Sequence, residues 1–269
     1  MGVLEDLAIF VAGVAAGTLN AIVGSGSLIT FPTLLAFGIP PVVANVSNNV
    51  GLVPGNASAA WGYRRELAGQ RSRLLWLAIF SALGAGAGAA ALLALPAGAF
   101  NVIVPVLILL SCALVLLQPW LSARIAARRE RAAAAAAAEG GSEDRAGRDR
   151  AVRGGPVLAG GLFGAGIYGG YFGAAQGVLV IGLLGTFLDE PMQRINGAKN
   201  VLVGVVNGVA AVVYVIFAHV SWVIVLLIAV GSTLGGLLGA RVGRRLPATA
   251  LRIFIVVIGV IASVKLIFF

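Results

Sequence analysis

The sequence predicts an all-α polytopic membrane protein made of two inverted repeats, and three observations support this class. Only 11% of its 269 residues are charged and 59% are hydrophobic, whereas a soluble domain carries roughly 25% charged residues. The apolar runs approach or reach the about 20 residues that a membrane-spanning helix needs. The two halves of the chain also match each other at one fixed offset. These features exclude a soluble enzyme, a nucleic-acid-binding module and a disordered protein.

Eight to ten apolar segments make up most of the chain, and one polar stretch divides them. The segments are 7–23, 27–37, 43–63, 74–94, 99–119, 156–172, 175–188, 196–217, 222–240 and 249–268. The intervening residues contain arginines, seven consecutive alanines and a mixed-charge stretch. We expect a helix that leaves the membrane and then a flexible linker. The predicted domains are a first membrane repeat at 1–119, the linker at 120–153 and a second membrane repeat at 154–269.

The repeat is visible when the first half is shifted by 151 positions onto the second. Asparagine matches carry the argument because the composition makes Leu, Ala and Val matches uninformative. Six of the nine asparagines form three pairs at this offset, which are Asn45 with Asn196, Asn49 with Asn200 and Asn56 with Asn207. Tyr63 falls on Tyr214 in the same way, and these rings suit an aromatic belt at the membrane surface.

The basic residues predict that the two repeats are inverted. The loop after residue 63 contains four arginines, whereas its counterpart at 215–224 has no Lys or Arg. The loop after residue 240 contains three arginines, and its counterpart at 90–94 has no charge. Because cytoplasmic loops are rich in Lys and Arg, matched loops lie on opposite sides. The linker is then cytoplasmic and both termini are outside, and the net charge of +9 indicates topology rather than a nucleic-acid partner.

This topology requires segments 7–37 and 156–188 to begin and end on the same side. Each is short for two full crossings of about 20 residues. We therefore expect a broken or re-entrant helical hairpin in each repeat, followed by three transmembrane helices. The hairpin tips are predicted at 20–27 and 169–177, where glycine is frequent. Irregular backbone at that depth is tolerated only where protein or a watery cavity surrounds it.

The asparagines form the first candidate site. Residues spaced like Asn45, Asn49 and Asn56 fall within about 40° of one another on a helix, and the second repeat has the same face. Amides are costly in hydrocarbon unless they are hydrogen-bonded. They either line a substrate site or join neighbouring helices, and the sequence favours neither. The candidate binding residues on these helices and in the first tip are Asn20, Asn45, Asn48, Asn49, Asn56, Asn196, Lys199, Asn200 and Asn207.

The hairpin tips form the second candidate site. Ser25, Gly26 and Ser27 precede a short apolar helix, and Gln176 and Gly177 hold the equivalent place in the second repeat. A helix N-terminus presents free backbone N–H groups and favours an anion. The alternative is that the glycines only permit close helix packing.

Lys199 replaces Asn48 in the second repeat and has two interpretations. It supplies a fixed positive charge to an anionic substrate, or it extends to the cytoplasmic interface, which is the more usual behaviour of a lysine near a helix end. No Asp or Glu lies inside an apolar segment, so the substrate is predicted to be an anion. The chain has only one His and one Cys, Cys112, which are too few for a metal cluster. No cofactor is expected.

These residues resemble a known family. The glycine-rich hairpin at 17–32, followed by a proline turn and the Asn-bearing helix at 45–63, and the second copy at 164–214, are similar to the TauE/SafE family of sulfite and organosulfur anion exporters. The resemblance implies secondary transport of sulfite or organosulfonates across the inner (plasma) membrane. Its members are usually described with about eight spans.

The resulting expectation is a non-enzymatic exporter that works by alternating access around a midplane site. Its partners are a small anionic substrate and the lipid bilayer, with no nucleic acid, and a homo-oligomer is left open. A passive anion channel is the nearest alternative. A remote one is an intramembrane serine hydrolase with Ser25 as nucleophile and His219 as base, although no acid is available to orient the histidine.

Overall fold

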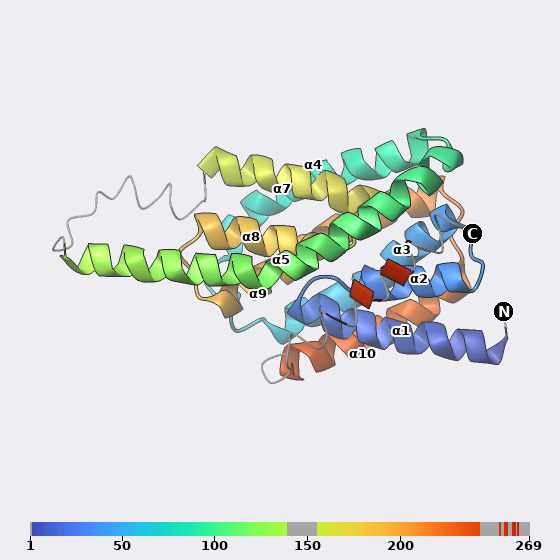
Figure 1. Cartoon of the computed structure of the whole chain (residues 1–269), viewed down its shortest axis with the longest axis horizontal. Coiled ribbons are helices and arrows are strands. Elements are labelled where there is room, and N and C mark those ends of the chain that lie inside the picture. The colour runs from blue at the N-terminus through green and yellow to red at the C-terminus, as the bar shows by residue number, and fades with distance from the viewer. Residues whose placement is uncertain are drawn as a thin grey trace.

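The computed structural model describes residues 2–138 and 155–242, together with residues 253, 256, 257, 260, 261 and 263. Within these ranges every regular element is a helix (Figure 1). The helices are α1 (Val3–Ile22), α2 (Ser27–Ala36), α3 (Pro41–Gly62), α4 (Arg71–Ala94), α5 (Ala97–Ala138), α7 (Gly155–Tyr171), α8 (Gln176–Phe187), α9 (Met192–Phe217) and α10 (Trp222–Val242). Most of the predicted last segment, 249–268, lies outside the described residues.

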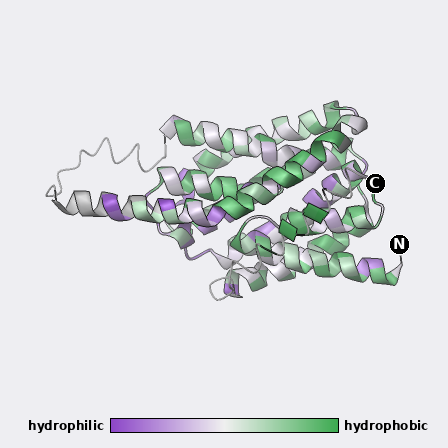
Figure 2. Ribbon diagram, viewed as in Figure 1, coloured by the Kyte–Doolittle hydropathy of each residue, from purple (hydrophilic) through white to green (hydrophobic). Residues whose placement is uncertain are grey.

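Five helices are long and apolar enough to cross a membrane. They are α1, α4, residues 98–124 of α5, α9 and α10. Hydrophobic residues extend along most of the bundle in Figure 2. Helix α3 has 22 residues but is not among the five, and it carries four of the asparagines. The predicted class, a polytopic all-α membrane protein, is confirmed.

Both predicted helix breaks are present. Helices α2 and α8 have only 10 and 12 residues, too few for a crossing. The chain turns before them at Gly24 and Gly173, where φ is +84° and +78°, a conformation that glycine adopts without a Cβ clash. The first arm of the first hairpin is longer than expected, because α1 alone has 20 residues and reaches the length of a full span.

The two halves of the chain interleave. Helix α1 packs along α10, and α7 packs along α4, so each broken helix pairs with a helix of the other half. Small residues make this possible. A methyl group added at Gly17 would collide with the backbone of Ser232, and one added at Gly170 would collide with the backbone of Ala85. In Figure 1, α1 and α7 begin at opposite ends of the bundle and run in opposite directions.

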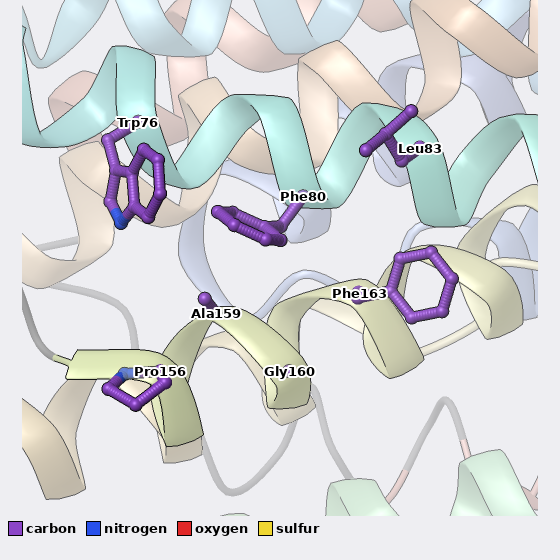
Figure 3. A pocket seen from close by; sticks show the side chains of 7 residues that line it. All are labelled: Trp76, Phe80, Leu83, Pro156, Ala159, Gly160 and Phe163. Carbon is purple, nitrogen blue, oxygen red and sulfur yellow. The ribbon is translucent and has the colours of Figure 1, made fainter.

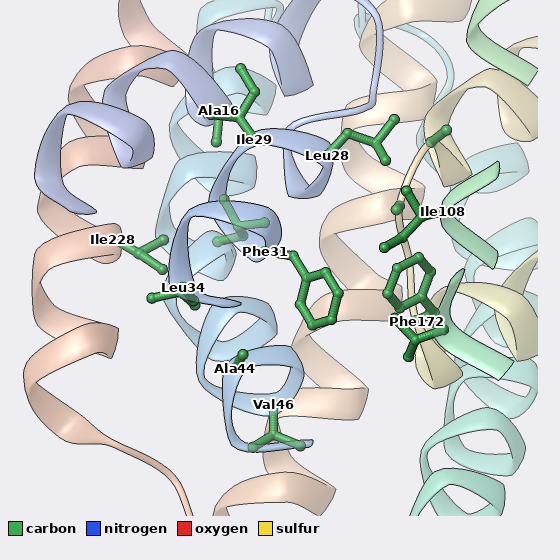
Figure 4. Packing of buried hydrophobic residues seen from close by; sticks show 14 of the residues in the cluster. Ala16, Leu28, Ile29, Phe31, Leu34, Ala44, Val46, Ile108, Phe172 and Ile228 are labelled. Atoms are coloured by element: carbon green, nitrogen blue, oxygen red, sulfur yellow. The ribbon is translucent and has the colours of Figure 1, made fainter. Parts of the chain in front are cut away.

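The larger apolar core surrounds α2 and the second break. Leu28, Phe31 and Leu34 of α2 are buried, and Phe31 meets Phe172 edge to face, with ring centroids 5.3 Å apart (Figure 4). Because lipid tails are as apolar as leucine, such contacts stabilise the fold by close packing rather than by leaving water. The aromatic pair therefore fixes the first short helix against the tip of the second hairpin.

Helix α5 extends 42 residues to Ala138, past the end of its apolar span at Arg124. It projects beyond the other helices in Figure 1. The remainder of the predicted linker, 139–154, lies outside the described residues, so its flexibility stays a prediction.

Candidate substrate site at the helix breaks

The two helix breaks touch each other. The backbone N–H of Gly177 donates to the carbonyl oxygen of Gly24 at 3.1 Å. A methyl group added at either glycine would collide with the backbone of the other. Only glycine at both positions permits this approach, so the tips of the two hairpins form a common centre.

Helix α9 caps the carbonyl end of α1 at this centre. The Nζ of Lys199 donates to the carbonyl oxygens of Asn20 and Ala21, at 2.6 and 3.3 Å. The side-chain amides of Asn196 and Asn200 donate to the carbonyl oxygen of Ala21, at 3.1 and 3.3 Å. The last carbonyls of a helix have no partner within it and carry a partial negative charge. Three donors of α9 therefore hold the break in place.

The expectation that Lys199 extends to the interface is wrong. The residue is 0% exposed, and its ammonium is directed at the α1 carbonyls instead of the membrane surface. None of the carboxylates in the described ranges pairs with it, since the recorded ion pairs all involve Glu190. A buried cation without a counter-ion is costly. The negative end of α1 offsets part of that cost.

The second break is capped by the first half and by α9. The amide of Asn45 donates to the carbonyl oxygen of Tyr171 at 3.0 Å, and the hydroxyl of Tyr214 donates to that of Gly170. Tyr63 accepts a hydrogen bond from Asn196 at 2.9 Å. Tyr63 and Tyr214 are 2% and 0% exposed, so the prediction that they form an aromatic belt is wrong. They belong to the interior that supports the breaks.

Three predicted site residues of the first half form hydrogen bonds between its helices. Asn20 donates to Asn56 at 2.9 Å and accepts from the backbone N–H of Gly26 at 3.1 Å. Asn48 accepts from the hydroxyl of Thr30 at 2.5 Å. These side chains act as interhelical links, which is one of the two interpretations that the sequence allowed. Asn20 also accepts the backbone N–H of Gly26, so one of the free N–H groups at the start of α2 already has a partner within the protein.

Other polar atoms at the breaks are buried without a partner. Among the described residues, the hydroxyl of Ser25 and both amide atoms of Gln176 accept or donate nothing, and one side-chain atom each of Asn49, Asn56 and Asn196 is also unpaired. Buried polar groups are ordinarily hydrogen-bonded. Ser25 and Gln176 occupy matched positions at the 151-residue offset and flank the contact between Gly24 and Gly177. The two breaks thus present unpaired polar atoms at equivalent positions of the two repeats.

The sequence reasoning missed one residue of this group. The hydroxyl of Tyr171 is buried and unpaired in the described structure. Its position within the glycine-rich tip at 169–177 was the available signal. Ser27 begins α2 and is half-buried. Asn207 is 6% exposed on α9 and forms none of the recorded hydrogen bonds. The structure does not bring Ser25 together with His219, which is exposed between α9 and α10.

The candidate site is enclosed. With the exception of Ser27 and Asn196, each predicted site residue is buried. Two surface grooves lie elsewhere and are apolar. One, of about 590 Å³, lies between α4 and α7 beside Trp76, Phe80 and Phe163 (Figure 3). The other, of about 350 Å³, lies between α5 and α8. Neither of these two grooves is lined by a predicted site residue.

An ion-pair network joins two connections of the bundle. Glu190, just before α9, accepts from Arg73 of α4 at 2.7 Å and from Arg194 of α9 at 2.6 Å. Arg194 also donates to the carbonyl oxygen of Ala68 at 3.2 Å. Burial alone would raise the pKa of Glu190, but hydrogen bonds and charge from the two arginines hold it below its ordinary value. The network joins the α3–α4 and α8–α9 connections.

The chain has recognisable relatives. The model of the family described as sulfite exporter TauE/SafE matches residues 9–266. The chain is 25% identical over 260 residues to a "probable membrane transporter protein" of Haemophilus influenzae, covering 97% of this chain and 93% of the relative. It is 26% identical over 261 residues to the "probable membrane transporter protein YfcA" of Escherichia coli, covering 97% and 88%. No solved structure matches the chain significantly.

Proposed function

The chain belongs to the sulfite exporter TauE/SafE family, and from this premise we propose that it exports small sulfur-containing anions such as sulfite or organosulfonates. Family membership and the apolar helices make it a multi-pass membrane transporter. We propose this substrate class from the family's description together with the chemistry of the helix breaks. We place the protein in the plasma membrane, with the linker 120–153 on the cytoplasmic side.

The observation that carries the proposal is the buried Lys199 side chain at the touching helix breaks. Lys199 has no carboxylate partner among the described residues, and Ser25 and Gln176 present unpaired polar atoms on either side of the Gly24–Gly177 contact. An oxyanion would supply the missing countercharge and accept hydrogen bonds from hydroxyl and amide donors. Broken helices at the midplane are the usual place for such sites in transporters with internal repeats.

Alternating access is the proposed mechanism. Its basis is the inverted relation of the two repeats, which is supported by the opposite directions of α1 and α7 and by the matching pairs α1 with α10 and α7 with α4. The enclosed centre and the Glu190 network suggest a state closed at the end where that network lies. Movement of one repeat against the other would open that end and close the other.

Binding and flux test this proposal together. We would measure thermal unfolding of the purified protein with sulfite, sulfate, thiosulfate, sulfoacetate and taurine, and transport of any stabilising anion in proteoliposomes. A ligand at a hundredfold its Kd stabilises by about 2.7 kcal/mol. The shift is expected to disappear in Lys199→Met and Gln176→Ala but to persist in Thr186→Val, a change on the exposed surface of α8. Stabilisation that survives both site variants would overturn the assignment of the site.

The flux assay separates the transporter from the alternative of a passive channel. A transporter gives a rate that saturates with substrate concentration, and an unlabelled anion on one side accelerates uptake of the labelled anion from the other. A rate that rises linearly with concentration and shows no exchange would contradict alternating access. Absence of flux for every sulfur anion would contradict the proposed substrate class.

A further inference from the structure

The groove between α5 and α8 is a second candidate binding site, and its lining is apolar. It has a volume of about 350 Å³ and is lined by leucines and Trp120 of α5 and by Leu179, Gly182 and Thr186 of α8. Gly182 lets Leu121 pack closely against α8, because a methyl group there would lie 2.7 Å from a side-chain carbon of Leu121. The groove thus has the apolar lining that an extended hydrocarbon chain requires.

The groove opens on the outer surface of the bundle. Leu117 and Trp120, on its α5 side, are 54% and 57% exposed, and Thr186 is exposed on its α8 side. This part of α5 belongs to the helix segment long and apolar enough to cross the membrane. The occupant therefore comes from the lipid phase, not from the substrate centre.

A cation marks one end of the groove. The guanidinium of Arg124 lies over the Trp120 ring, 4.7 Å from its centroid, and Arg124 is the last residue of the apolar span. Arg128, Arg129 and Arg131 follow along the chain. Clusters of four or more basic residues directly after a transmembrane helix attract anionic lipids. The positive end suits the phosphate of a phospholipid, and the apolar lining suits its acyl chain.

We propose that this groove binds an anionic phospholipid, with an acyl chain between α5 and α8 and the phosphate beside Arg124. This site goes beyond the transport of sulfur anions and does not depend on it. Helix α8 carries Gln176 at its first residue, so the bound lipid contacts the same short helix that forms the second break.

Native mass spectrometry of the purified protein tests the proposal directly. Phosphatidylglycerol and phosphatidylcholine with identical acyl chains would be titrated against the wild type and three variants. Arg124→Gln removes the cation, and Thr186→Trp fills the groove from its exposed side. Arg64→Gln is the matched control, because Arg64 also lies over a tryptophan, Trp61, at 5.1 Å, yet Trp61 does not line this groove.

The expected pattern distinguishes the contribution of the lipid headgroup from that of the acyl chain. Wild type retains phosphatidylglycerol more tightly than phosphatidylcholine. Arg124→Gln weakens the binding of phosphatidylglycerol about fivefold, the effect of removing one interfacial cation, and leaves that of phosphatidylcholine unchanged. Thr186→Trp removes one bound lipid of either kind, and Arg64→Gln has no effect. Equal retention of the two lipids, an equal effect of Arg64→Gln, or association of a second copy of the chain that Thr186→Trp blocks would overturn the proposal. Arg124→Gln tests it independently if Thr186→Trp does not fold.

Discussion

At the scale of single residues, the protein depends on a few polar groups that hold irregular backbone inside the membrane. Lys199, Asn196 and Asn200 satisfy carbonyls at the end of α1, and Asn45 and Tyr214 do the same for the second break. Such backbone groups would cost several kcal/mol each if they faced lipid. The capping residues therefore support the breaks, and we propose that Lys199, together with the unpaired atoms beside it, also binds the substrate.

The contact between the two tips can be tested at Gly24. Gly24→Ala places a methyl group in the backbone of Gly177 and forces alanine into a left-handed conformation, which costs roughly 1–2 kcal/mol by itself. We expect an additional loss of about 1–3 kcal/mol from overpacking and a lower midpoint of thermal unfolding.

Gly38→Ala provides the control for this change. Gly38 has φ of +76°, but a methyl group there meets nothing within 4 Å, so only the conformational cost applies. Gly24→Ala must destabilise more than Gly38→Ala. Equal shifts in the unfolding midpoint would mean that the tips do not touch.

Sequence reasoning located these residues better than it assigned their roles. The breaks were predictable because glycine clusters at 20–27 and 169–177 interrupt apolar runs that are too short for two crossings. The position of Lys199 near a helix end indicated an interfacial lysine, because the sequence does not reveal that the carbonyls of Asn20 and Ala21, about 180 positions away, lie within reach. Tyr63 and Tyr214 were misassigned for the same reason.

At the scale of elements, close helix packing through glycine positions the breaks. Helix α4 carries Gly84, Gly86 and Gly88. Methyl groups at Gly84 and Gly88 would collide with carbonyls of α7, at Phe163 and Ile167, whereas Gly86 faces open space. Interfaces of this kind depend on small residues because helices in lipid gain stability mainly from close contact.

This difference predicts opposite effects of the same substitution on one helix. Gly88→Ala is expected to destabilise the protein by about 1–3 kcal/mol, since α4 must move away from α7. Gly86→Ala is expected to stabilise it by up to about 1 kcal/mol, since alanine favours a helix over glycine. Thermal unfolding in one detergent compares the two variants with wild type. A loss of stability of the same size in both would contradict the α4–α7 contact.

The ion-pair network between the α3–α4 and α8–α9 connections gives a prediction for pH. A carboxyl group whose pKa is lowered by folding stabilises the protein above its unfolded pKa and loses this contribution as the pH falls through its folded pKa. Glu190 is such a group. Glu190→Gln is therefore expected to lower stability by about 1 kcal/mol at neutral pH. The difference from wild type should shrink once the pH falls below the unfolded pKa of about 4.3 and vanish below the lower folded pKa.

A neighbouring residue controls for the loss of one negative charge. Asp189→Asn removes the same charge one position earlier, outside the recorded pairs with Arg73 and Arg194. Its stability should follow that of the wild type across the pH range. A constant difference between Glu190→Gln and wild type from pH 7 to pH 3 would show that the carboxylate is not the source of the stabilisation.

At the scale of the whole molecule, the arrangement supports the topology that we infer from the charges. The Glu190 network brings together the connection at 63–71, which contains three arginines, and the acidic connection at 187–192, which Arg194 follows in α9. The backbone N–H of Ser221, beside the uncharged α9–α10 connection, donates to the hydroxyl of Ser47 near the start of α3 at 2.9 Å. The α3–α4 and α9–α10 connections are counterparts at the 151-residue offset, so their sidedness decides between inverted and parallel repeats.

Single-cysteine labelling tests this topology in cells. Cys112 is 4% exposed and would first be replaced by serine. Cysteines introduced at the exposed positions Arg65, Asp189, Leu95 and His219 would then be treated with a membrane-impermeant maleimide. Because basic loops stay in the cytoplasm, Arg65→Cys and Asp189→Cys should react only after the membrane is opened. Leu95→Cys and His219→Cys should react in intact cells. Reaction of Arg65→Cys and His219→Cys from the same side would require parallel repeats. The proposed rocking of one inverted repeat against the other would then have no basis.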